Sequence, residues 1–138
     1  RPYPPERMLA LAQEYGIPVD PIEAQMPLLL HGPVGAEVLR REWGVSDEAV
    51  LEAVACHTTG RGGMGTLAKL VFLADKLEPG KADLYPHLER VRELVEKDLD
   101  RALLELLNIQ IEALGQEGLP VHPAMLQARD SLLGRLQG

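Results

Sequence analysis

Leucine and isoleucine recur at every third or fourth position through a long segment near the end of the chain. The apolar side chains of this segment are Leu99, Leu103, Leu106, Leu107, Ile111 and Leu114. This spacing places them along one face of an α-helix. No stretch of the sequence shows a convincing alternation of apolar and polar residues between hairpin turns, which is the pattern typical of strands. The sequence therefore predicts an all-α fold.

Prolines and glycines divide the 138 residues into segments of helical length. Proline is favoured in the first turn of a helix and glycine just after the last turn. Asp20 and Ser46 are of the type that caps helix N-termini. The predicted helices span residues 4–15, 20–25, 33–43, 46–57, 66–77, 86–96, 98–116 and 123–136, and residues 58–65 form a glycine-rich loop.

Helix 66–77 is apolar almost all round, so we expect it to be central and buried. In helix 46–57, Val50, Leu51 and Val54 are expected to face inward. The length suits one compact domain, and we predict a single helical bundle over residues 1–138.

Composition excludes several classes of protein. A net charge of −7 with few aromatic residues argues against a nucleic-acid partner. No apolar run is long enough to span a membrane. One cysteine, Cys56, cannot form an internal disulfide and is expected to be a buried thiol in the reducing cytoplasm. The chain begins at Arg1 without a methionine, so we expect that N-terminal helices of the protein are missing from it.

Three side chains on separate predicted helices are candidate metal ligands. Asp75 follows an apolar stretch of helix 66–77, where a carboxylate needs a cation, either a metal ion or a side chain such as Lys69 or Arg61. His31 is followed by Gly32 and Gly35, which leave room for another backbone or a ligand, and His57 ends an apolar segment. Two imidazoles and a carboxylate suit iron or a similar transition metal. A hydrogen-bonded core histidine and a salt-bridged aspartate remain the simpler alternatives.

The loop after His57 offers groups that suit phosphate oxygens. Thr58 and Thr59 supply hydroxyls, Gly60 an unhindered amide, and Arg61 a guanidinium that can bind phosphate with two hydrogen bonds. The alternative is a surface loop with a solvated arginine. His122 precedes the last predicted helix, where it would cap that helix or face solvent.

Four blocks of sequence together resemble the YqeK-type HD-domain hydrolases. They are LHGPVGA at 30–36, HTTGR at 57–61, FLADKLEPG at 72–80 and the segment 121–129 that begins VHP. The resemblance covers essentially the whole chain. It implies an all-helical, HD-domain-like bundle that binds two divalent metal ions, usually iron. It also implies symmetrical hydrolysis of diadenosine tetraphosphate to two ADP.

The resemblance also assigns roles to individual residues. His31, His57 and Asp75 would be metal ligands, and Asp75 and Arg61 would be catalytic. Substrate phosphates would lie beside Thr58, Thr59, Gly60 and Arg61, and His122 would border the nucleotide pocket.

The chain departs from the family pattern in its ligand set. The family also uses an N-terminal histidine and a His-Asp pair, and none of the four histidines here is followed by aspartate. The ligand set is therefore incomplete, and the missing ligands are expected upstream of Arg1. Gly63, Lys81 and Asp130 stand where the family more often has proline, arginine and asparagine.

Two alternatives stay open at this point. One is an HD-type phosphohydrolase acting on another nucleotide, and the other is a metal-free helical module for binding or dimerisation. A homodimer is compatible with each of these functions.

Overall fold

The computed structural model describes residues 4–78 and 88–137, and every regular element in these residues is helical. The prediction of an all-α fold is confirmed. The elements are α1 (Pro5–Glu14), α2 (Pro21–Gln25), a 3-10 turn η1 (Pro27–Leu30), α3 (His31–Glu42), α4 (Glu48–Cys56), α5 (Thr66–Lys76), α6 (Leu88–Val95), α7 (Leu99–Gln116) and α8 (Pro123–Gln137).

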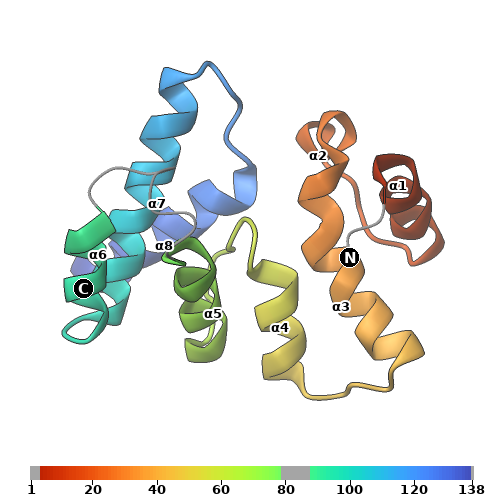
Figure 1. The fold of residues 1–138 in the computed structure, drawn as a ribbon, viewed down its shortest axis with the longest axis horizontal. Coiled ribbons are helices and arrows are strands. Elements are labelled where there is room, and N and C mark those ends of the chain that lie inside the picture. The colour runs from red at the N-terminus through yellow and green to blue at the C-terminus, as the bar shows by residue number, and fades with distance from the viewer. Residues whose placement is uncertain (1–3, 79–87, 138) are drawn as a thin grey trace.

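The helices form two groups that meet at α3 and α4 (Figure 1). Helices α1, α2 and α3 lie at one end of the molecule, and α5 to α8 lie at the other, with α4 between them. Each group has its own apolar core. The smaller core contains Met8, Leu11, Ala12, Leu30 and Val34, and the larger core is built mainly from α5, α7 and α8 around Phe72, Leu103, Leu106 and Leu107.

The long C-terminal stripe behaves as its spacing predicts. Leu103, Leu106 and Leu107 are fully buried on α7, and Leu99, Ile111 and Leu114 pack against the larger core. Burying one leucine side chain contributes about 2 kcal/mol. The apolar face of α7 therefore holds α6, α7 and α8 together.

The predicted N-terminal cap is correct for α2 and wrong for α4. Asp20 caps α2 as expected: its carboxylate accepts a hydrogen bond from the Ile22 amide at 2.7 Å, and Glu23 completes a capping box. Ser46 does not cap α4. Asp47 does, by accepting from the amides of Ala49 and Val50. A carboxylate one residue further on can reach the first free amides of α4, and it also complements the positive end of the helix dipole.

Helix α5 was expected to be central and buried, and the structure buries only part of its surface. Leu67 and Leu70 are 41% and 43% exposed, because the main contacts of α5 within the described residues are with α4 and α7, and they leave these two leucines uncovered. Val50 on α4 is likewise 38% exposed and does not face inward, whereas Leu51 is buried. Apolarity all round a helix does not fix how many neighbours the helix has.

The start of α3 differs from its prediction. Helix α3 begins at His31, two residues earlier than expected, because Pro33 fits within a first helical turn, where no partner for its missing N–H is needed. Helix α6 is described from Leu88, so the predicted start at Pro86 lies outside the described residues, as does Lys81. No helix in the described ranges combines the length and apolarity that a bilayer crossing requires.

Candidate functional site

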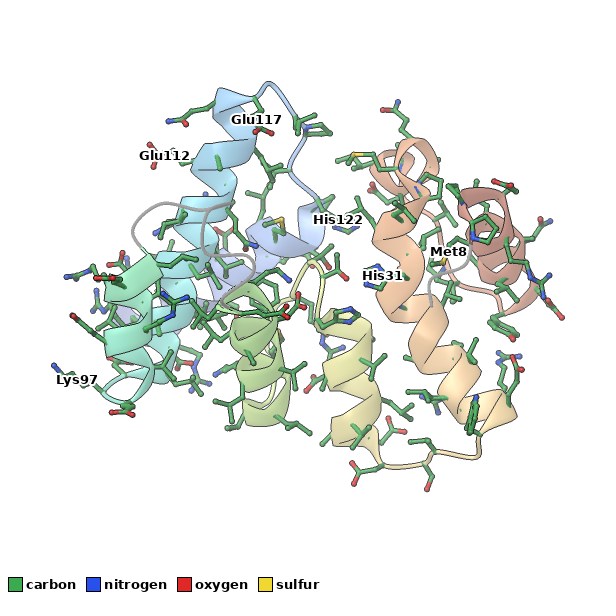
Figure 2. All side chains as sticks on the ribbon, viewed as in Figure 1. Met8, His31, Lys97, Glu112, Glu117 and His122 are labelled. Atoms are coloured by element: carbon green, nitrogen blue, oxygen red, sulfur yellow. The ribbon has the colours of Figure 1, made fainter. Side chains whose placement is uncertain are left out.

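Two histidines that are 26 positions apart in the sequence meet where α3 and α4 cross. His31 is the first residue of α3, and His57 directly follows α4. Their Nε2 atoms are 2.8 Å apart, and their rings stand nearly perpendicular, at 74°. Figure 2 shows His31 on the side of α3 that faces the rest of the molecule. The sequence-based pairing of these two residues on separate helices is therefore realised in the fold.

Backbone carbonyls fix the orientation of both imidazole rings. His31 Nδ1 lies 2.7 Å from the carbonyl oxygen of Leu28, and His57 Nδ1 lies 2.6 Å from that of Val54. A carbonyl oxygen only accepts hydrogen bonds, so Nδ1 of each ring must carry the proton. A ring that carries a proton at Nδ1 alone presents the lone pair of its Nε2 to the other ring. Two acceptors at this distance repel each other unless a proton or a cation lies between or beside them.

This donor set fits a transition-metal ion. Histidine ligands commonly donate their second ring nitrogen to a carbonyl or carboxylate, as both rings do here. Two nitrogen ligands about 2.1 Å from one ion and at a right angle to each other lie about 3.0 Å apart, close to the observed Nε2–Nε2 distance. Over residues 4–78 and 88–137, however, no group of three or more His, Cys, Asp or Glu is close enough to form a complete site.

Asp75 lies near the histidines but is paired with its neighbour. Lys76 donates to the Asp75 carboxylate at 2.8 Å and to the backbone carbonyl of His57 at 2.7 Å. The expected side-chain partners were Lys69 or Arg61, which instead pair with Asp100 and Glu52. The Asp75 side chain is also one third exposed. The desolvation argument made for Asp75 is therefore weaker than the sequence indicated.

The histidine pair opens into a cavity of about 540 Å³ between the two groups of helices. Polar and charged side chains in its lining include those of His31, His57, Thr58, Asp75 and Lys76. The remaining lining residues are Leu29, Gln110, Ala113, Leu114, Glu117 and Met125. The Thr58 hydroxyl is 3.2 Å from His31 Nε2. Three predicted metal ligands and one predicted phosphate contact thus line one cavity.

The rest of the predicted phosphate loop lies outside this lining. The Thr59 hydroxyl donates to the carbonyl of Gly60, and Gly60 is a buried turn residue with φ +70° packed beside Phe72. Arg61 forms an ion pair with Glu52, and the hydrogen bond from Arg61 to that carboxylate raises the pKa of the guanidinium. Arg61 lines two other hollows of the surface. Phosphate contacts of these three residues stay predictions.

His122 has both ring nitrogens engaged within the protein. Nδ1 accepts from the Ala124 amide at 2.9 Å, so Nε2 carries the proton and donates to Glu23 at 2.8 Å. His122 thus caps α8, which was one of the two simple alternatives, and links α8 to α2. Figure 2 shows its side chain between the two groups of helices. Its contact with a nucleotide stays a prediction.

Sequence reasoning missed Lys76 and Gln110 as lining residues. Lys76 stands beside Asp75 within the FLADKLEPG block, which was a usable signal. Gln110 is 3% exposed, and its Oε1 atom has no hydrogen-bond partner among the described residues. It occupies a position of the α7 stripe, three residues after Leu107 and four before Leu114. A polar residue at such a position was also a recognisable signal.

Comparison with known proteins agrees with this fold. No family model matches the chain. The chain is 42% identical over 97 residues to the symmetrical bis(5'-nucleosyl)-tetraphosphatase of Bacillus subtilis, covering 70% of this chain and 51% of that protein. It is 41% identical over 105 residues to the protein of the same name from Halalkalibacterium halodurans, covering 76% and 55%. The chain spans about half the length of these curated relatives.

A solved structure extends the similarity over nearly the whole chain. It is described as a predicted HD superfamily hydrolase involved in NAD metabolism from Clostridium acetobutylicum. The TM-score is 0.88 at 30% identity, and the alignment covers 96% of this chain and 69% of that one. The chain thus has the all-helical fold of an HD superfamily hydrolase. The chain belongs to this superfamily, in the YqeK-type family that its sequence resembles.

Proposed function

We propose that the protein is a metal-dependent phosphohydrolase that splits diadenosine tetraphosphate symmetrically into two ADP. The observation that carries this proposal is the pair of Nε2 atoms that lie 2.8 Å apart on rings oriented by two backbone carbonyls. With Nδ1 of each ring donating to a carbonyl, a proton or a cation must lie between or beside the two Nε2 atoms, and a metal cation suits this arrangement. The names of the Bacillus subtilis and Halalkalibacterium halodurans relatives support the substrate class, a bis(5'-nucleosyl) tetraphosphate, and the family resemblance supplies adenosine as the nucleoside.

His31, His57 and Asp75 are the residues of this chain that would hold metal. A bound divalent ion supplies positive charge to phosphate oxygens and lowers the pKa of water so that hydroxide forms near neutral pH. HD hydrolases generally depend on divalent metals, and we extend the proposal to two ions of iron on the family resemblance. The described residues offer no complete set for two ions. The same resemblance places further ligands on an N-terminal histidine and a His-Asp pair.

The remaining lining residues suit a nucleotide with its phosphates near the histidines. The Thr58 hydroxyl can donate to a phosphate oxygen, and the Lys76 ammonium places a positive charge in the wall. The side chains of Leu29, Leu114 and Met125 offer an apolar surface of the kind that a base can pack against. Contact with substrate is also proposed for Thr59, Gly60, Arg61 and His122. It requires a change of conformation in loop 58–65 and at the start of α8. We place the reaction in the cytoplasm, which fits the lone thiol of Cys56.

The test uses the protein at its natural length, with metal content measured beside turnover. Purified protein is assayed for ADP release from diadenosine tetraphosphate, and bound metals are quantified by elemental analysis. His57→Ala and Asp75→Ala should abolish turnover and lower metal content while helicity by circular dichroism is kept. Glu14→Ala, on the exposed face of α1, is the matched control. Full turnover of either site variant with normal metal content contradicts the assignment.

Assays on the same purified protein distinguish this function from two alternatives. A panel of mononucleotides and dinucleoside polyphosphates identifies an HD-type phosphohydrolase with another substrate. Absence of metal together with absence of hydrolysis would favour a helical binding or dimerisation module.

A further inference from the structure

The contact between α3 and α4 that brings the two histidines together depends on one missing side chain. Gly32 follows His31 and is buried against the last turn of α4. A Cβ atom added at Gly32 would lie 2.6 Å from the carbonyl oxygen of Ala55. This is closer than real Cβ atoms approach any heavy atom, and the obstructing atom is backbone that cannot rotate away. Any side chain at position 32 therefore forces α3 and α4 apart.

The same contact involves the carbonyl that orients His57. The added Cβ would lie 3.1 Å from the carbonyl oxygen of Val54, and this oxygen accepts the Nδ1 proton of His57 at 2.6 Å. On the other side of the contact, His31 is the residue next to Gly32. A displacement at position 32 thus acts on both imidazoles, on one through its chain neighbour and on the other through its hydrogen-bond acceptor.

We propose that Gly32 is a positioning residue for the metal site: its lack of a side chain sets the separation of α3 and α4 at which both Nε2 atoms meet one ion. This inference rests on the proposed function, because it presumes that the histidine pair binds metal. It adds a residue that touches neither metal nor substrate and acts through the backbone carbonyls of residues 54 and 55.

Gly35 provides a matched control on the same helix. A Cβ at Gly35 would lie 3.6 Å from the Val54 side chain, which is an ordinary contact. Both Gly→Ala substitutions add intrinsic helix propensity to α3. They differ in that only the one at position 32 collides with the backbone of α4.

The experiment measures Co²⁺ binding to the metal-free protein by calorimetry and by visible absorption, which reports the ligand geometry independently of turnover. Gly32→Ala should raise the dissociation constant about tenfold or more, as loss of ligand-orienting contacts does in metal sites, and should alter the absorption bands. Gly35→Ala should leave both unchanged. In a His31→Ala background, Gly32→Ala should raise the Co²⁺ dissociation constant by a smaller factor than it does alone. One of the two ligands that Gly32 positions is already absent there.

Thermal unfolding and circular dichroism accompany each variant. If Gly32→Ala alone does not fold, the measurement is made on Gly32→Ala/Gly35→Ala, in which the second substitution adds helix propensity. Failure of both to fold would overturn the proposal, because Gly32 would then be a general packing requirement. Unchanged Co²⁺ affinity and spectrum in folded Gly32→Ala would overturn the positioning role alone. Absence of Co²⁺ binding by the unsubstituted protein would overturn the proposed function as well.

Discussion

The Nε2 proton of His122 is donated to the carboxylate of Glu23 over 2.8 Å, joining residues 99 positions apart in the sequence. Both side chains are about nine-tenths buried. The other oxygen of Glu23 accepts from the Asp20 amide in the capping box of α2. One carboxylate therefore both caps α2 and ties α2 to the start of α8.

Replacing this carboxylate should destabilise the fold. The Glu23→Gln side chain keeps one acceptor oxygen where the carboxylate has two. It can accept from the Asp20 amide or from His122, and its NH2 group then faces the other donor. We expect a loss of about 1–3 kcal/mol in the free energy of unfolding, measured by urea denaturation. Glu14→Gln on the exposed face of α1 is the control and should change stability by less than about 0.5 kcal/mol. Equal stability of both variants would show that the link contributes nothing.

The ion pair between Lys69 and Asp100 predicts acid sensitivity. Lys69 Nζ donates to Asp100 at 2.6 Å, and Arg135 donates to the other oxygen at 3.0 Å. The hydrogen bond from Lys69, helped by Arg135, lowers the pKa of Asp100 in the folded state. A lowered folded pKa stabilises the protein above the unfolded value, about 3.9 for aspartate, and this stabilisation disappears as the pH falls through the folded value.

Asp100→Asn should therefore lower stability near neutral pH by about 2–4 kcal/mol, because the Lys69 ammonium is left buried without its anion. It should also flatten the loss of stability below about pH 4. Urea denaturation as a function of pH measures both effects. Arg135→Ala removes the exposed partner and should cost no more than about 1 kcal/mol. If Asp100→Asn loses stability at low pH as steeply as the unsubstituted protein does, other carboxylates cause that loss.

The Cys56 thiol should be unreactive in the folded protein. Cys56 is 4% exposed, and burial raises the pKa of its thiol. The thiolate is the reactive form, so alkylation by iodoacetamide at pH 8 should be slow when folded and fast in urea. Since Cys56 is the one cysteine of the chain, intact mass reports the reaction directly. Stoichiometric labelling within minutes under native conditions would mean that the end of α4 opens readily.

Gln110 should contribute more to substrate binding in the cavity than to the free energy of unfolding. Its side chain is buried in the cavity wall, yet its Oε1 has no hydrogen-bond partner among the described residues. An unsatisfied buried oxygen costs about 1–3 kcal/mol, so Gln110→Leu should leave the free energy of unfolding unchanged or raise it by about 1 kcal/mol. If the amide binds substrate, KM should rise while stability does not fall. A clear loss of stability would reveal a structural partner of this amide.

The sequence was sufficient for the helices, the family and the histidine pair. Spacing of three and four residues determines which face of α7 is apolar, since helix geometry is local. Motif blocks such as HTTGR keep their residues in order and so identify the family without coordinates. The glycines after His31 indicated a close approach of another backbone or of a ligand, and Gly32 makes such an approach to the backbone of Ala55.

Only the tertiary structure decided which charged groups pair and which apolar faces stay open. Arg61 pairs with Glu52, Asp75 with Lys76, and His122 with Glu23, whereas residue types alone allowed several partners for each. Leu67 and Leu70 are exposed although their helix is apolar, because burial depends on neighbouring helices rather than on the helix itself. Helix formation follows from contacts within about four residues, but ion pairing and burial follow from how distant segments pack. That is why the sequence determined the helices and the packing determined the partners.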